Sequence, residues 1–140
     1  MGTVKKGKRA ELLMMAMLIK NGFNVFEELA DEEGIDCGVL ARNNTFYPIQ
    51  IKSRADFVGG DLVSVHNFCD NMLVIIYDEK SEDYWIIPAD EYRKMSTIQK
   101  DKDGTEYYRL TVKKRKPLLL ENYKKEKGIQ VLRRKVNSKP

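Results

Sequence analysis

Two strand-like segments, at residues 35–41 and 45–53, are separated by only three residues, Arg42, Asn43 and Asn44. Asparagine favours tight turns because its side chain bonds to the nearby backbone and it tolerates left-handed conformations. So short a connection joins antiparallel strands, since parallel neighbours need a crossover of about a dozen residues or more. We therefore predict an antiparallel hairpin, and the lack of a Gly-rich phosphate loop also disfavours a doubly wound nucleotide-binding sheet.

Further helix-like and strand-like segments flank this hairpin. The residue types predict helices at residues 8–21, 89–95 and 118–127, and strands at residues 23–29, 72–77, 84–87 and 105–112. Residues 61–71 are too mixed to assign. This order predicts an α/β fold of the mixed α+β kind, with a central mixed β-sheet flanked by helices.

Three local features refine that prediction. Pro48 lacks a ladder donor, so it predicts an edge side, a bulge or a strand start near it. Residues 105–112 resemble an edge strand with Tyr107, Arg109 and Thr111 on one face. In the first helix, residues 12–19 are apolar on every side, so we expect cover from the sheet and also from another helix or a partner subunit.

Length and composition indicate a single domain, because the chain has 140 residues, of which 42% are hydrophobic and 33% charged. No apolar run has membrane-spanning length and no signal-peptide pattern is present, so we expect a cytoplasmic protein with no membrane partner. Cys37 and Cys69 stand far apart without Cys or His spacing around them, so neither a disulfide framework nor a zinc site is expected. Cys37 is interpreted as a small buried residue.

Charge is distributed unevenly along the chain. Residues 113–140 contain eleven Lys or Arg against two Glu, a net charge of +9, so residues 1–112 carry −5 of the total of +4. We therefore divide the chain into residues 1–112 and a basic C-terminal extension, residues 113–140, packed on or trailing the same domain. Such a segment suits neutralisation of phosphates, and the alternative is a solvated tail that binds nothing.

The strand at residues 45–53 carries the residues that point to chemistry. At period two, Ile49 and Ile51 face one side of the strand while Gln50 and Lys52 face the other. An amide and an ammonium buried without partners would be costly, so acidic partners are expected nearby. Asp36, on the neighbouring strand of the hairpin, and Glu11, the only acid in the first helix, are the candidates.

Two carboxylates and an amide oxygen form an oxygen-ligand site for a hard divalent ion, with the ammonium of a lysine beside it. Mg²⁺ suits it best, because it uses one or two protein carboxylates and takes further ligands from water and substrate phosphate. Hydrolysis of a phosphodiester needs these parts, with Lys52 steadying the attacking water and the charge that develops on phosphorus. The acidic cluster of Glu27 and its neighbours, in contrast, is interpreted as a solvated loop.

A set of short motifs in the first 55 residues resembles a known superfamily. The motifs are Lys5-Lys6-Gly7-Lys8-Arg9-Ala10-Glu11, Asn21-Gly22-Phe23, Gly34-Ile35-Asp36 and Pro48-Ile49-Gln50-Ile51-Lys52-Ser53. Together they resemble the PD-(D/E)XK nucleases, within them the archaeal-type Holliday-junction resolvases and related small endonucleases. The resemblance implies a restriction-endonuclease-like core in which residues 72–77 form a further core strand.

The same resemblance implies a role for each site residue. Glu11 matches the acid of the first helix, Asp36 the metal-binding aspartate, Gln50 the (D/E) position and Lys52 the motif lysine. Two positions depart from the pattern: Gln50 is neutral, which lowers the expected ion affinity, and Ile35 replaces the proline of the name. Certain homing endonucleases of this superfamily look similar in using QxK.

The expectation is a Mg²⁺-dependent DNA endonuclease in which Mn²⁺ substitutes, acting as a homodimer. Phosphate contacts are expected from the basic extension and from Lys5, Lys6, Lys8, Arg9, Ser53 and Arg54. One alternative is a DNA-binding module that keeps the fold with an idle site, and another is a protein-interaction domain without affinity for nucleic acid. His66 is expected at the surface, and strand aromatics such as Tyr107, Tyr108 and Trp85 more often pack in cores than stack on bases.

Overall fold

The computed structural model describes residues 2–27, 34–112 and 119–137. The helices within these ranges are α1 (Thr3–Lys20), α2 (Ala89–Met95), the short 3₁₀ helix η1 (Glu121–Tyr123) and α4 (Glu126–Asn137). The strands are β1 (Val25–Glu27), β2 (Cys37–Leu40), β3 (Phe46–Arg54), β4 (Val63–Val65), β5 (Leu73–Asp78), β6 (Tyr84–Pro88), β7 (Thr97–Lys100) and β8 (Glu106–Leu110). None of the described helices combines the length and the apolarity needed to cross a membrane.

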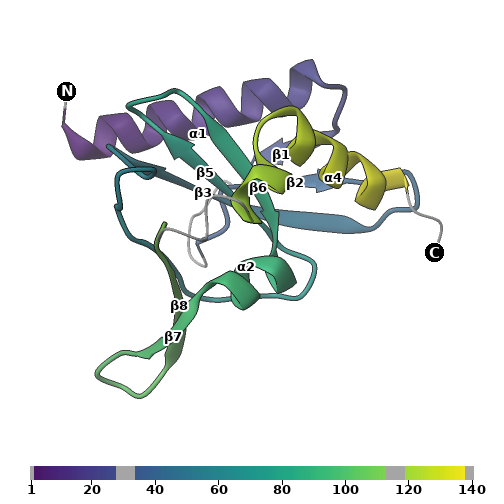
Figure 1. Ribbon diagram of the computed structural model, residues 1–140. Coiled ribbons are helices and arrows are strands. Elements are labelled where there is room, and N and C mark those ends of the chain that lie inside the picture. The colour runs from purple at the N-terminus through teal and green to yellow at the C-terminus, as the bar shows by residue number, and fades with distance from the viewer. Residues whose placement is uncertain (1, 28–33, 113–118, 138–140) are drawn as a thin grey trace.

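The central sheet has the strand order β1-β2-β3-β5-β6 (Figure 1). Strands β3 and β5 are parallel and the other neighbouring pairs are antiparallel, so the sheet is mixed, as predicted. The β2–β3 hairpin is confirmed: Ala41 donates its N–H to the Thr45 carbonyl at 2.8 Å, and Asn44 takes a positive φ of 68°. Pro48 lies just before β3 begins to pair with β5 at Ile49, so it interrupts no β3–β5 ladder.

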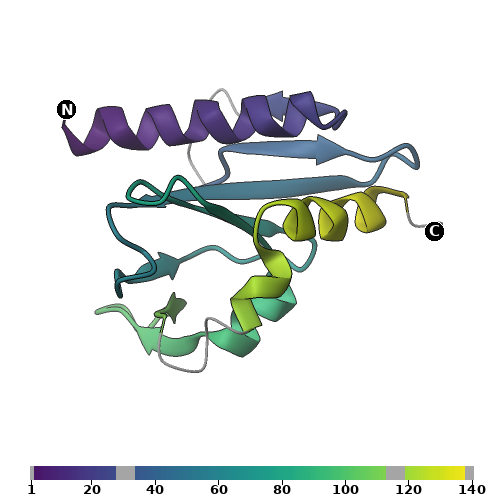
Figure 2. The same cartoon turned by 45° about the horizontal axis from the view of Figure 1, so that its top comes forward.

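The two faces of the central sheet pack against different elements (Figure 2). Helix α1 covers one face over a core that includes Ile49, Ile51 and Ile75. The opposite face packs against α2 and a second sheet, of strand order β4-β8-β7, through a core that includes Val74 and Ile76. Strand β5 is therefore buried on both sides along its whole length.

The second sheet corrects two sequence predictions. The segment predicted as an edge strand at residues 105–112 contains β8, which lies between β4 and β7. Strand β4 lies in the unassigned residues 61–71, and β7 follows α2, where no strand is predicted. Both are only three or four residues long, and Ile98 is the sole large apolar residue of β7, so neither produces a detectable alternation.

Helix α1 is longer and less covered than predicted. It begins at Thr3 rather than residue 8, because the lysine-rich first turns are good helix formers. Ala10, Met14 and Leu18 are buried against the sheet, but Leu12 and Ile19 are 52% and 61% exposed. The sheet buries only one side of the apolar run. No second helix of the described residues covers the exposed side that carries Leu12 and Ile19, so that part of the prediction is wrong.

The last helix also differs from its prediction. The prediction at residues 118–127 is confirmed in part, because residues 119–123 are helical and end in η1, whereas α4 covers Glu126–Asn137; residue 118 lies outside the described residues. Ile129 and Leu132 are buried in the core beneath α1, three residues apart on one helix face. The clustered basic residues hide this apolar stripe in the sequence, so helix α4 is found only in the structure.

Candidate functional site

Strand β3 presents Gln50 and Lys52 on the face of the central sheet turned toward the second sheet. Their partners in the parallel register are Val74 and Ile76, both members of the core on that side. Gln50 is only 2% exposed, whereas Lys52 is half-buried. The alternation read from the sequence therefore matches the structure.

The Gln50 amide is fixed by a main-chain partner. Its Nε2 donates a hydrogen bond to the His66 carbonyl at 3.1 Å, directly after β4. Gly34, at a positive φ of 74°, lies against the same amide, since a Cβ there would come within 3.2 Å of Nε2. A glutamate would turn an oxygen toward the His66 oxygen, so the structure favours an amide here, whose Nε2 is used by this hydrogen bond.

Asp36 lies against the segment between Gln50 and Lys52. Its N–H donates to the Ile49 carbonyl at 2.9 Å, and its Oδ2 accepts a hydrogen bond from the Ile51 N–H at 2.7 Å. Just before β2 begins, the carboxylate thus accepts the hydrogen bond that a main-chain carbonyl would otherwise accept. Two residues that are fourteen positions apart in the sequence are brought to the same point of the sheet.

Glu11 lies on α1, the helix that packs on the face of the sheet opposite to the one that Gln50 and Lys52 face, and Glu27 lies on β1. Lys8 Nζ lies 3.5 Å from a Glu11 carboxylate oxygen and 3.7 Å from a Glu27 carboxylate oxygen. Burial is the main cause that raises the pKa of the Cys37 thiol to about 12, and the negative charges of Asp36, Glu11 and Glu27 contribute to the same rise. The thiol therefore lies within electrostatic range of these three carboxylates.

Glu27 is the residue of this group that sequence reasoning missed. It pairs with Cys37 in the antiparallel β1–β2 register, which places it beside the residue that follows Asp36. In the sequence it stands at the start of an acidic run and reads as a loop residue. Knowledge of the β1–β2 register would have placed Glu27 next to Cys37. The sequence carries no direct signal of that register.

Several of the predicted phosphate contacts are engaged within the protein. Arg9 pairs with Glu79, and Lys8 is bound to the carboxylates already described. Arg54 donates from Nε to the Leu62 carbonyl at 2.6 Å and from Nη1 to the Ser53 carbonyl at 2.7 Å. Lys5 and Lys6 are exposed on the first turns of α1, and Ser53 is half-buried.

The basic C-terminal segment is partly used for packing. Lys124 and Lys125 lie 3.4 Å and 2.6 Å from the carboxylate of Asp83, in the β5–β6 turn. Arg133 donates to the Asn21 carbonyl at 3.3 Å and lies over the ring of Phe23. Residues 113–116, which carry four of its basic side chains, lie outside the described residues.

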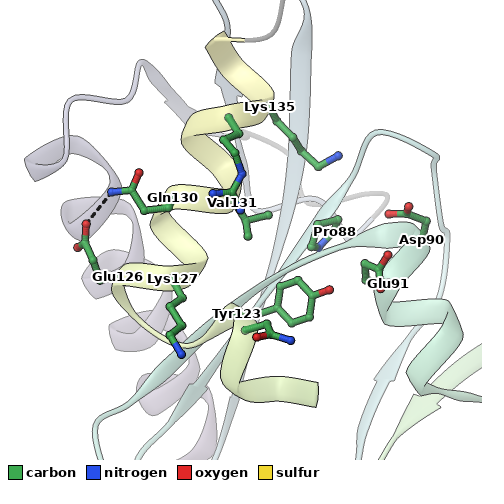
Figure 3. A pocket seen from close by; sticks show the side chains of 11 residues that line it. Pro88, Asp90, Glu91, Tyr123, Glu126, Lys127, Gln130, Val131 and Lys135 are labelled. Carbon is green, nitrogen blue, oxygen red and sulfur yellow. Dashed lines mark hydrogen bonds between the residues drawn. The ribbon is translucent and has the colours of Figure 1, made fainter. Parts of the chain in front are cut away.

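A groove of about 900 Å³ lies elsewhere, between α2 and α4 (Figure 3). Carboxylates of Asp90 and Glu91 and basic groups of Lys127 and Arg134 line it together. Burial and the adjacent Glu91 raise the pKa of its Tyr123 to about 12. None of Glu11, Asp36, Gln50 and Lys52 lines this groove, whereas its basic residues belong to the C-terminal extension that is predicted to contact phosphates.

The described residues contain no group of three or more His, Cys, Asp or Glu side chains placed to hold a metal. An ion at this region would therefore need the amide oxygen of Gln50 in addition to carboxylates. Asp36 and Gln50 are held together around β3, and Glu11 lies within electrostatic range of the residue beside Asp36.

The fold is a mixed α/β fold, with a long N-terminal helix across one face of a mixed sheet and with Gln50 and Lys52 on a central strand. The solved structure of a bacterial homing endonuclease, I-Ssp6803I, shares this fold with a TM-score of 0.69 over 100% of both chains, at 14% sequence identity. No protein-family model matches the chain, and no curated protein matches its sequence.

Proposed function

We propose that the protein is a metal-dependent DNA endonuclease of the PD-(D/E)XK type. Glu11, Asp36 and Gln50 would hold the ion and Lys52 would act as the catalytic cation. The observation that carries this proposal is the hydrogen bond from Ile51 N–H to the Asp36 carboxylate, which holds the acid between Gln50 and Lys52. The shared fold with a homing endonuclease supports the same reaction class.

The donor set fits Mg²⁺, with Mn²⁺ as a substitute. Carboxylate and amide oxygens are the hard ligands that these ions prefer, and Gln50 supplies its oxygen from a fixed position. When bound, the ion would lower the pKa of a bound water and polarise a phosphate oxygen. Because Gln50 is neutral, the expected affinity is lower than in a site with three carboxylates.

The protein groups have distinct roles in this proposal. The Lys52 ammonium orients the attacking water and stabilises the negative charge on the phosphate oxygens in the transition state. Asp36 and Gln50 would hold the ion at a fixed position relative to Lys52, and the ion would supply the contact to the scissile phosphate. Lys8 already contacts Glu11, so a cation that binds there competes with its ammonium.

The proposed substrate is DNA, either a branched junction or a specific duplex site. Lys5 and Lys6, exposed at the start of α1, and the basic C-terminal segment are the proposed phosphate contacts. A second copy of the chain is proposed on the outer side of α1, where Leu12, Leu13 and Ile19 are exposed. Sedimentation equilibrium measures that homodimer directly.

The purified chain should be incubated with a four-way junction, supercoiled plasmid and a randomised duplex library, in Mg²⁺, Mn²⁺ or EDTA. We expect metal-dependent cleavage that falls about 10²- to 10³-fold in Lys52→Ala while salt-sensitive DNA binding persists. Lys20→Ala, which removes a lysine from the last turn of α1, is the matched control and should cleave at the wild-type rate.

Two outcomes would contradict the enzyme. DNA binding without cleavage in any metal would indicate the idle binding module. Retention on DNA that does not change between about 50 and 200 mM salt would indicate a protein-interaction domain, because phosphate contacts lose several decades of affinity over that range.

A further inference from the structure

One face of the β7–β8 hairpin is lined by polar side chains that the proposed reaction does not use. Along β8, Tyr108 and Leu110 pack in the core between the sheets, so Tyr107 and Arg109 point to the other side. The antiparallel register places Thr97 opposite Arg109 and Gln99 opposite Tyr107. We call the side formed by Thr97, Gln99, Tyr107 and Arg109 the outer face.

The guanidinium of Arg109 is held in place without being neutralised. Its Nη2 donates to the Tyr107 hydroxyl at 3.1 Å, and its Cζ lies 5.8 Å from the centre of the Tyr107 ring. The buried Nε has no hydrogen-bond partner, and none of the ion pairs formed among the described residues involves this arginine. A preorganised cation with unused donor capacity is suited to acceptors supplied by a ligand.

The outer face is connected to the candidate site through β4. The His66 ring stacks on Tyr107 with centroids 4.5 Å apart, and the His66 carbonyl accepts the hydrogen bond from Gln50. At the other end of β4, the Leu62 carbonyl accepts from Arg54 of β3. Both ends of β4 are thus attached to the strand that carries Gln50 and Lys52, which fixes the outer face relative to that strand.

The hairpin has the dimensions and chemistry of a base-reading element. It extends from the body on the side away from α1 (Figures 1 and 2). The hairpin is two-stranded beyond Tyr108, where the pairing of β8 with β4 ends, and Arg109 lies at the base of this two-stranded part, opposite Ser64 of β4. A two-stranded ribbon fits the DNA major groove, which is about 12 Å wide, and there arginine pairs with guanine, glutamine with adenine and threonine with several bases. Near the turn, the two lysines Lys100 and Lys102 are outnumbered by Asp101, Asp103 and Glu106, a net charge of −1, so this end of the hairpin has no net attraction to phosphate.

We propose that the outer face of the β7–β8 hairpin reads base edges in the DNA major groove beside the cleavage site, with Arg109 as the main determinant of base preference. The inference rests on the proposed function for the choice of DNA as the ligand. It adds a specificity-determining surface to the cleavage chemistry.

Selection of bound duplexes from a randomised library, in EDTA, tests the inference separately from cleavage. The wild type should enrich a preferred sequence, and Arg109→Ala should lower affinity for that sequence about 10- to 100-fold and lose the preference at one position. Arg109→Lys, which keeps the charge but not the bidentate geometry, should lose the same preference. Lys100→Ala, on the other face of the hairpin, should select the wild-type sequence.

The possible results separate the two proposals. An unchanged selected sequence in both Arg109 variants, or no enrichment by the wild type, would overturn the reading role even if the protein cleaves DNA. A sequence preference that depends on Arg109 in a protein that never cleaves would support the reading role and remove the nuclease proposal. Thermal unfolding of each variant shows whether a loss of DNA binding is caused by misfolding. If Arg109→Ala is misfolded, the selected sequence of Arg109→Lys decides the result.

Discussion

The two sheets of this protein differ in how much of their surface is buried. All six residues of β5 in the central sheet are buried, because one core covers each face. The second sheet has one face in a core, while on the other Thr97 is exposed and Gln99 half-buried. Packing therefore restricts residue choice in the central sheet, whereas the outer face of the second sheet accepts polar residues at little cost in stability.

The largest expected effect tests this difference directly. Ile75 of β5 is fully buried. Its replacement by alanine should lower the unfolding free energy by about 2–5 kcal/mol, because it leaves a cavity in a packed core. Thr97→Ala, on the outer face, should change stability by no more than about 0.5 kcal/mol. Urea unfolding measures both, and equal losses would show that the two sheets are not packed differently.

An intermediate effect is expected at the contact between the sheets. Gln50→Glu should lower the unfolding free energy by about 1–3 kcal/mol at neutral pH, because a carboxylate cannot donate to the His66 carbonyl. The loss should shrink in acid, where the protonated side chain regains a donor. Urea unfolding across pH measures this, with Gln99→Glu on the half-buried outer face as the control, and a loss that does not depend on pH would refute the explanation.

The smallest expected effect concerns the attachment of the C-terminal segment to the central sheet. The hydrogen bond from Lys125 is the main cause that lowers the pKa of Asp83 below its usual value of 3.8, with Lys124 contributing. A lowered folded-state pKa stabilises the fold above the unfolded value, and this contribution is lost as the pH falls through the folded value. Asp83→Asn should therefore be less stable than wild type near neutrality and should approach it in acid. Unfolding of the wild type and Asp83→Asn across pH measures this, with Asp103→Asn in the exposed β7–β8 turn as the control. A stability difference between wild type and Asp83→Asn that does not change with pH would exclude the ion pairs as its source.

The sequence predicts the central sheet better than the second sheet for physical reasons. The turn at Asn43 and Asn44 is short enough to impose the β2–β3 hairpin, and the apolar residues of β5 and β6 are recognisable without tertiary information. Strand β7 offers a single large apolar residue, and the lysines and arginines of α4 conceal its buried stripe. Such elements are stabilised by contacts that form only when the chain has folded.

The candidate site divides in the same way. Asp36, Gln50 and Lys52 are recognisable from polar residues in otherwise apolar strands, because such residues need partners. Glu27 depends on strand register, and the partner of Gln50 is a main-chain carbonyl, which any residue type provides. The functional roles of these residues remain predictions to be tested by the variants above.

The anchoring of the Asp36 carboxylate to an amide of the neighbouring strand has a consequence for how this protein can diverge. An N–H exists at position 51 for every residue type except proline, so the acid keeps its position while the surrounding side chains are exchanged. A position that is fixed by the polypeptide backbone in this way tolerates extensive substitution of the neighbouring side chains. Such geometry can therefore be kept when little sequence identity is left.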